Sequence, residues 1–333
     1  MHTHLSERPI VMLIPQEGEP AVIIPTLEAP KAKSAGIPDH LIFNWGDDEG
    51  YMGAFQNACQ ELGLAGSTIA VEKLYMRMLE WDMLEEFAAG LKREYADPIL
   101  NGLRLVKDDE EVANLQKAID IAEEAMTELL PQIKIGMTEK QIAGMLSQLM
   151  IEKGSEGNPF GPIVSSGPNA ASPHAVPTDR PIQAGELMIV DWGAIVNDYP
   201  SDITRTFAVG ELSEELKEMY AVVKAANEAG LAAVSPQSTC SHVDEAARKI
   251  IGDAGYGEYF IHRTGHGLGL EIHEEPSMIT GNANPLVEGM TFTVEPGVYV
   301  PNVAGVRIED DVLVTGSGIR VLTSFSKDLQ TVG

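Results

Sequence analysis

The sequence predicts an α+β protein of two domains, in which a small α/β domain (residues 1–105) precedes a larger domain (residues 106–333). Three observations support this prediction. The 333 residues exceed the roughly 250–300 residues at which a single hydrophobic core stops growing. Short apolar runs alternate with helical patterns through the first part of the chain. One pattern of helix, strand and acidic residue occurs twice in the second part.

The first domain is predicted from apolar runs that are separated by turn residues and helical segments. The runs typical of strands are residues 10–14, 21–24, 40–45 and 68–71, and the helical segments are residues 51–62 and 76–89. Alternation of this kind is typical of an α/β domain. The first strand lies close to the start of the chain, so we expect a domain that lacks its first elements.

The second domain is predicted to begin with a long helix. Residues 107–111 are charged, and residues 112–130 carry apolar side chains at spacings of three and four, which indicates one buried helical face. A second helix is expected at Thr138, because Thr138 and Gln141 have the spacing of a capping box. Further helical patterns occupy residues 213–229 and 241–254.

The second domain contains an internal duplication. In the first copy, a helix is followed by His-x-x-Pro, a glycine and an apolar strand that ends at Asp191. The second copy has the same order, and its strand ends at Glu295. Each strand then returns through another acid, Asp202 or Glu309. A duplicated unit builds similar halves that face each other, so we expect the four acids to converge where the halves meet.

The four acids lie inside or at the ends of apolar strands. Burying one carboxylate costs free energy unless a cation neutralises it, and four at matched positions would repel one another strongly in a low-dielectric site. Two divalent cations would remove this repulsion. Any one acid alone is more often a turn residue or a member of a surface ion pair. The joint arrangement is what predicts a metal site.

A histidine completes the set of candidate ligands. His266 lies between Gly265 and Gly267, where the bare backbone lets a ligand approach closely. One imidazole and four carboxylates suit manganese, cobalt, iron or zinc. The same glycines could be taken for a nucleotide-binding loop, but they lack the full Gly-x-Gly-x-x-Gly spacing.

At these residues the sequence resembles the pita-bread metallopeptidases, the family that includes prolidase, aminopeptidase P and methionine aminopeptidase. The matching segments are Asp191-Trp192-Gly193-Ala194, Ser201-Asp202-Ile203-Thr204-Arg205-Thr206, His262-Arg263-Thr264-Gly265-His266-Gly267-Leu268-Gly269, His273-Glu274-Glu275-Pro276, Val294-Glu295-Pro296-Gly297 and Gly305-Val306-Arg307-Ile308-Glu309-Asp310. The resemblance implies a pita-bread catalytic domain after a shortened creatinase-like α/β domain. Two departures, a large Trp192 and the dipeptide Tyr199-Pro200, remove no ligand.

The resemblance also implies a role for each ligand. Asp191 would hold one metal ion, Asp202 and Glu309 would bridge two ions, and His266 and Glu295 would hold the second. Because all five residues are present, the chain does not resemble the metal-free creatinase subtype. The implied cofactor is two divalent ions, with manganese or cobalt favoured over zinc or iron.

Three residues are candidates for the chemistry itself. Glu295 is predicted to carry the proton to the leaving nitrogen, His273 to donate to the tetrahedral oxyanion, and His174 to contact the leaving-group side. A lone histidine near a proline is more often a turn residue. The duplicated His-x-x-Pro pattern and the family motif favour catalytic roles for both histidines.

Substrate contacts are predicted from the same segments. His262 is expected to line a pocket for proline. Arg307 shares a strand face with Glu309, and both a carboxylate-binding role and an ion pair to a nearby acid stay open for it. Tyr299 is a further candidate near the substrate. Residues 310–311 are acidic, but we expect neither to be a ligand.

Composition limits the partners. The net charge of −27 and the pI near 4.5 disfavour nucleic acid and anionic membranes. Cys59 and Cys240 are far apart, which fits a reducing cytoplasm. The first residues carry no basic and apolar signal, and no apolar run approaches the length of a membrane helix. The family resemblance implies a homodimer.

The predicted function is hydrolysis of the Xaa-Pro bond at the N-terminus of dipeptides or short peptides. Two alternatives stay open, a hydrolase of a small non-peptide amide or amidine on the same scaffold, and a non-catalytic peptide-binding relic. A relic is expected to lose ligands, and this chain has all five. Methionine aminopeptidase fits less well, because an α/β domain precedes the catalytic domain. The choice between dipeptides and longer peptides is not determined by these residues.

Overall fold

The computed structural model describes residues 6–333. The residues at which the absence of a signal peptide was inferred, Met1 to His4, lie outside this range. The chain forms two compact units that divide between Leu100 and Asn101, whereas the sequence predicted a boundary at residues 105–106.

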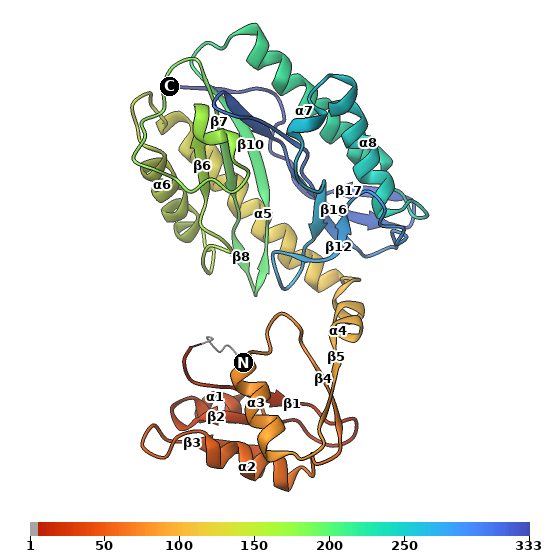
Figure 1. Ribbon diagram of the computed structural model, residues 1–333. Coiled ribbons are helices and arrows are strands. Elements are labelled where there is room, and N and C mark those ends of the chain that lie inside the picture. The colour runs from red at the N-terminus through yellow and green to blue at the C-terminus, as the bar shows by residue number, and fades with distance from the viewer. Residues whose placement is uncertain (1–5) are drawn as a thin grey trace. The chain divides into compact units, whose positions relative to one another are not determined.

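The first unit is an α/β unit with two small sheets (Figure 1). In one sheet, the central strand pairs antiparallel with one neighbour and parallel with the other. Its strands are β1 (Val11–Leu13), β2 (Ala21–Pro25) and β3 (Ile42–Trp45). Strands β4 (Thr68–Val71) and β5 (Lys92–Tyr95) form a parallel pair. The helices are α1 (Ala29–Ser34), α2 (Met52–Glu61), α3 (Met78–Phe87) and α4 (Asp97–Arg104), the last of which runs across the division.

The core of the first unit lies between the three-stranded sheet and helices α2 and α3. Phe55 and Leu84 are completely buried there, and Trp81 is nearly so. Strands β1 to β4 and helices α2 and α3 lie within about two residues of the predicted ranges. Apolar periodicity therefore indicated this part of the fold correctly.

The second unit opens with a helical pair. Helix α5 (Asp109–Leu129) begins with a capping box between Asp108 and Glu111. Helix α6 (Glu139–Glu152) begins with the predicted capping box between Thr138 and Gln141. The strands that follow are β6 (Ile163–Ser166), β7 (Glu186–Trp192), β8 (Ile195–Val196), β9 (Tyr199–Pro200) and β10 (Ile203–Val209).

The remainder of the second unit follows the same order. A second helical pair, α7 (Glu214–Ala233) and α8 (Cys240–Asp253), is followed by strands. These are β11 (Gly265–Gly267), β12 (Glu274–Met278), β13 (Thr291–Val294), β14 (Gly297–Val300), β15 (Ala304–Arg307), β16 (Asp310–Thr315), β17 (Gly318–Val321) and β18 (Thr331–Val332). Short 3-10 helices cover Thr26–Glu28, Asp39–Leu41, Leu130–Gln132, Gly167–Ala171 and Gly257–Tyr259.

The duplication is visible in the topology. Two sheets have the orders β18-β10-β7-β6 and β12-β11-β13-β16-β17. In each half, a short hairpin (β8–β9 or β14–β15) separates the two strands that flank the acids. Gly185 and Gly289 have φ values of 88° and 87°, and each donates its N–H to the strand that follows the hairpin, at Val209 O and Val314 O. A left-handed conformation at both turns explains why both copies contain glycine.

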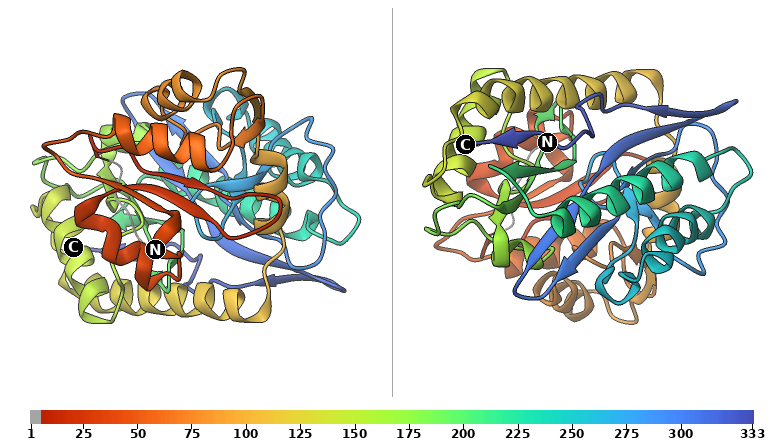
Figure 2. Two further views of the ribbon diagram at one scale, coloured as in Figure 1. Left: turned by 90° about the horizontal axis from the view of Figure 1, so that it is seen from below. Right: turned by 90° about the horizontal axis from the view of Figure 1, so that it is seen from above.

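Helices cover each sheet on its own side. Helices α5 and α6 lie along the sheet of β6, β7 and β10, and α7 and α8 lie along the sheet of β13 and β16 (Figures 1 and 2). Trp192, larger than the residue that the resemblance leads us to expect, is completely buried in the first of these layers. Its indole N–H donates to Ala122 O at 2.8 Å, so its single polar group is satisfied.

Two further findings concern the whole described chain. Among the helices of residues 6–333, none combines the length and the hydropathy that a membrane crossing requires. Cys59 and Cys240 are both buried and unbonded to each other.

Candidate metal centre

The candidate ligands lie where the two sheets of the second unit meet. Asp191 is in β7, and Asp202 directly precedes β10. Glu295 directly follows β13, and Glu309 directly precedes β16. The sheets are joined at this seam, because the N–H of Glu309 donates to Thr204 O at 3.1 Å. Matched positions of the duplicated unit therefore converge.

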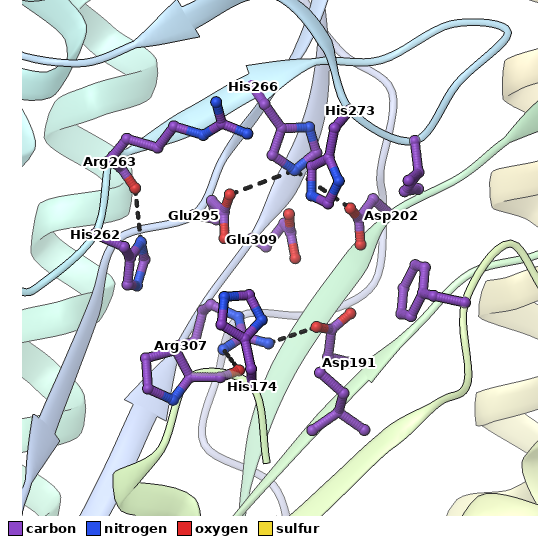
Figure 3. Close-up of a pocket in the computed structure, with 14 residues that line it drawn as sticks. His174, Asp191, Asp202, His262, Arg263, His266, His273, Glu295, Arg307 and Glu309 are labelled. Atoms are coloured by element: carbon purple, nitrogen blue, oxygen red, sulfur yellow. Dashed lines mark hydrogen bonds and ion pairs between the residues drawn. The ribbon is translucent and has the colours of Figure 1, made fainter. Parts of the chain in front are cut away.

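The acids border a cavity of about 240 Å³. Figure 3 shows Asp202, Glu295 and Glu309 around the ring of His266, with His174 on the side of Asp191. The cavity brings together nine of the ten residues predicted for the site: His174, Asp191, Asp202, His262, His266, His273, Glu295, Arg307 and Glu309. The tenth, Tyr299, is buried behind them and does not line the cavity.

The imidazole of His266 is the centre of the ligand group. Its Nε2 lies 3.5 Å from Asp202 Oδ2 and 3.5 Å from Glu295 Oε1. Among the described residues, ligand atoms of Asp202, His266 and Glu309 all lie within 4.8 Å of one another. The ring of His273 packs edge-on against His266, with 4.2 Å between ring centroids.

Burial disturbs the protonation of every acid in the group. Burial raises the pKa of Asp202 and Glu309 well above the usual range, and neighbouring carboxylates raise it further. Burial and Asp191 raise the pKa of Glu295 to about 7, against the lowering effect of Arg307. The pKa of Asp191 is also raised by burial, although Arg307 opposes that rise. A divalent cation would remove this penalty, because it favours the ionised forms.

Two further features fit a cation. Asp191 Oδ1 and Glu309 Oε1 are buried oxygens without a hydrogen-bond partner among the described residues. Burial, with help from His273, lowers the pKa of His266 to about 3, so its ring is neutral and able to coordinate. An unsatisfied buried acceptor is costly, and a metal ion would satisfy both oxygens. The residues present therefore fit divalent metal ions.

A network of hydrogen bonds around Arg307 holds the acids in place. The guanidinium of Arg307 bonds to the Asp191 carboxylate, and its Nε donates to Thr204 Oγ1 at 3.1 Å. The Thr204 hydroxyl in turn donates to Glu309 Oε2 at 2.6 Å. Arg307 also donates to the Tyr299 hydroxyl at 3.0 Å. Of the two interpretations left open for Arg307, the structure contains the ion pair with a nearby acid.

The adjacent acids Asp310 and Asp311 point away from the cavity. Asp310 pairs with Arg205 at 2.8 Å and with Lys327 at 3.0 Å. Asp311 accepts a hydrogen bond from the backbone N–H of Asp202 at 3.1 Å. Neither residue lines the cavity. Both therefore support the strands that carry ligands.

Several cavity residues were not predicted from the sequence. Arg263 lines the cavity and donates to Ser277 Oγ at 3.0 Å. It lies next to His262 in a segment that resembles the family, so its position was an available signal. Four apolar residues also line the cavity, and no sequence pattern indicated them: Phe160, Ile163, Pro173 and Ile272.

The fold and the site together define a metal-dependent hydrolase with the pita-bread fold. The sequence model of metallopeptidase family M24 matches residues 113–316. The chain belongs to this family, and it is a peptidase that uses divalent metal ions. This confirms the fold class and the class of enzyme predicted from the sequence.

Relatives cover nearly the whole chain. The Xaa-Pro dipeptidase of Lactobacillus helveticus is 37% identical over 98% of this chain and 89% of its own length. The crystal structure of a prolidase from Thermococcus sibiricus superimposes with a TM-score of 0.92 at 35% identity, covering 98% of this chain and 88% of that one. An X-Pro aminopeptidase structure from Thermotoga maritima has a TM-score of 0.80 at 33% identity, covering 95% and 88%.

Proposed function

We propose that this chain hydrolyses the bond between an N-terminal residue and a following proline in dipeptides or short peptides. The observation that carries the proposal is the convergence of three buried acids, the largely buried Glu295 and a neutral His266 on a cavity of about 240 Å³. A cavity of this size suits a small substrate, such as a short peptide, better than a folded protein. The end-to-end similarity to Xaa-Pro dipeptidases supports proline as the second residue.

The proposed cofactor is two divalent ions, with manganese or cobalt favoured. Asp191 would hold one ion, Asp202 and Glu309 would bridge both, and His266 and Glu295 would hold the second. When bound, such ions polarise a carbonyl and lower the pKa of water. An oxygen-rich ligand set with one imidazole suits these metals.

Protein groups would move the protons. Glu295 lines the same cavity, where its carboxylate would accept a proton and return it to the leaving nitrogen. Burial lowers the pKa of His273, so its neutral ring can donate an N–H to the developing oxyanion. His174 lines the same cavity from the other half, where it would contact the leaving-group side.

Two neighbouring residues would recognise the substrate. Burial lowers the pKa of His262 to about 4, and its uncharged ring suits contact with the proline ring. Arg263 lines the cavity with a guanidinium, which suits the free carboxylate of a dipeptide. The guanidinium of Arg307 is occupied by Asp191, Thr204 and Tyr299. We therefore assign Arg307 to orienting Asp191 rather than to binding substrate.

Three further proposals concern the first unit, the oligomeric state and the cellular compartment. The first unit is assigned as a creatinase-like α/β domain, because it precedes a pita-bread domain and combines small sheets with helices. We propose a homodimer by analogy with the family. The two buried, unbonded cysteines are consistent with a reducing cytoplasm.

The test is hydrolysis of alanyl-proline and of a tripeptide with proline second, by metal-stripped protein with and without added manganese. Cleavage of the dipeptide alone supports a prolidase, and cleavage of both supports an aminopeptidase P activity. Asp202→Asn should abolish the manganese-dependent activity. Asp179→Asn is the control, because Asp179 is exposed and pairs only with Lys140 among the described residues.

A specific outcome would overturn the proposal. If wild-type protein binds manganese and cuts neither peptide, the assignment of Xaa-Pro substrates is wrong. A panel of small amides and amidines would then be assayed with the same metal-loaded protein.

A further inference from the structure

In the first half, one buried carboxylate accepts hydrogen bonds from both ends of the segment that carries His174. We call a carboxylate that joins the two ends of a His-x-x-Pro segment in this way a bracket. Glu139, at the start of α6, is completely buried. Its carboxylate accepts from Ser166 N at 2.8 Å and from the Ser166 hydroxyl at 3.2 Å. It also accepts from Thr178 N at 3.0 Å and from the Thr178 hydroxyl at 2.7 Å. Residues 166 and 178 therefore meet at one side chain, and His174 lies in the loop between them.

A second buried carboxylate repeats this arrangement in the other half. Asp244, in α8, is completely buried. It accepts from Thr264 N at 3.1 Å and the Thr264 hydroxyl at 2.7 Å. It also accepts from Thr280 N at 3.0 Å and from the Thr280 hydroxyl. The segment between these threonines carries His266 and His273.

The two brackets correspond within the duplicated fold. Each carboxylate comes from the second helix of its half, α6 or α8. Each accepts the N–H and the O–H of one residue on either side of the His-x-x-Pro segment. Neither carboxylate lines the cavity. The two acids lie at different positions in their helices, Glu139 at the first residue of α6 and Asp244 at the fifth residue of α8. Both halves nevertheless use a costly buried carboxylate to hold the two ends of the segment, which points to a shared requirement at the two histidines.

The acids differ in their charge partners. Arg248 donates to Asp244 through Nε and Nη2, both at 2.9 Å, and Nη2 also donates to His262 O at 2.8 Å. Burial alone would raise the pKa of Asp244, but hydrogen bonds from Arg248, Thr280 and Thr264 hold it below its usual value. Asp244 is therefore an ionised acceptor. Glu139 receives its additional bonds from the Asn169 amide, at 3.1 and 3.2 Å.

We propose that Glu139 and Asp244 are paired positioning residues, one per half, that fix His174 and His273 on opposite sides of the reacting bond. The inference rests on the proposed function, since it assigns both histidines to the reaction. Misplacing a catalytic group by about 1 Å can cost on the order of 100-fold in rate. A carboxylate suits this task, because it only accepts hydrogen bonds, and all four groups that flank each histidine are donors.

The test replaces each acid by its amide, as Glu139→Gln and Asp244→Asn. The amide keeps the shape but turns an NH₂ toward backbone donors. We expect kcat on alanyl-proline at saturating manganese to fall by about 10- to 100-fold, with KM changed by less than about threefold. Thr178→Val and Thr280→Val each remove one hydroxyl donor and serve as milder variants if the amide variants fail to fold.

The matched control is Glu123→Gln. Glu123 is also buried, and it accepts from Ser324 N, the Ser324 hydroxyl and Phe325 N. It ties a C-terminal segment that carries no candidate catalytic residue. Its amide variant should lose comparable stability while kcat stays within about twofold of wild type. Equal loss of kcat in Glu123→Gln at equal thermal destabilisation would overturn the positioning role.

Amide hydrogen exchange separates this inference from the proposed function. Glu139→Gln should speed exchange in residues 166–178, and Asp244→Asn should speed it in residues 264–280, with the other segment unchanged in each variant. If wild-type protein cuts no Xaa-Pro peptide, the proposed function fails while this measurement still tests the brackets. Unchanged exchange in both segments would refute the brackets whatever the activity.

Discussion

The ion pair between Lys107 and Glu274 allows a quantitative prediction. Lys107 Nζ lies 3.0 Å from Glu274 Oε2, and the two side chains are only 1% and 5% exposed. The other oxygen of Glu274 accepts from Glu271 N at 3.1 Å. Glu274 directly follows His273, so one carboxylate links the start of α5 to the loop that carries a candidate catalytic histidine. The perturbation is Lys107→Met, which keeps the apolar stem and removes the charge.

The magnitude follows from burial. At 3.0 Å and an effective dielectric of about 20, the gross attraction is about 5 kcal/mol, and breaking a buried pair by removing one partner typically costs about 3–5 kcal/mol. Glu274 keeps its bond from Glu271 N, so we expect the lower end, about 3 kcal/mol. For a unit of this size, each kcal/mol shifts Tm by about 2–4 °C. The expected shift is therefore about 6–12 °C.

The assay is a double-mutant cycle of Lys107→Met, Glu274→Gln and the double variant, followed by thermal unfolding and kcat. The double variant should recover at least about 1.5 kcal/mol relative to the sum of the single variants, because it leaves no unpaired charge. Lys153→Met is the control, since its partner Glu128 is 53% exposed and such pairs contribute about 1 kcal/mol or less. A coupling energy below about 1 kcal/mol would refute the reasoning.

Three further predictions concern the site and its supports. His273→Ala should lower kcat by about 100-fold with metal content unchanged, whereas Asp202→Asn should lose metal and activity together; metal analysis beside kinetics distinguishes them. Because burial raises the pKa of Glu295 from 4.5 to about 7, its contribution to the stability of the metal-free chain should fall as the pH rises through these values, whereas the lowered pKa values of His262 and His266 act in the opposite direction. Urea midpoints in chelator are therefore compared with those of Glu295→Gln, and a wild-type midpoint that rises with pH relative to that variant would contradict this. Asp310→Asn should cost about 3 kcal/mol in urea unfolding, because it leaves Arg205 unpaired and buried; a loss below about 1 kcal/mol would count against that pairing.

The parts of the fold that could be predicted are those whose signal is local or repeated. Helices α5 and α6 have capping boxes and apolar faces at helical spacing. The strands of the second unit could be matched in pairs, because the duplication gives each element a counterpart. Strand β5 was missed, since all four of its residues are exposed and show no apolar alternation. It is held by parallel pairing with β4, which the sequence of β5 alone does not encode.

The candidate site likewise contains residues that the sequence predicts and residues that only the fold identifies. The four acids could be found because burial of a carboxylate in an apolar strand is unusual and because the pattern occurs twice. Phe160 and Ile163 meet the cavity only after folding brings β6 beside β7, and apolar residues in such positions look like ordinary core. Arg307 illustrates the limit of face arguments. Arg307 ends β15 and Glu309 directly precedes β16, so the two residues do not share one strand as predicted. The partner of Arg307, Asp191, is 116 residues away, and only the fold identifies it.

The two halves of the second unit have a similar order of helices and strands, but the side chains that they place at the cavity differ in charge. Strand β11 beside β13 carries His266, whereas its counterpart β6 beside β7 carries the apolar Ile163 at the cavity. Asp191 forms an ion pair with Arg307, whereas its counterpart Glu295 lies 3.5 Å from the imidazole of His266. A fixed positive charge weakens the attraction for a cation, whereas a neutral imidazole adds a ligand without adding charge. If the proposed two ions bind, the position bordered by Asp191 should therefore hold its ion less tightly than the position bordered by His266.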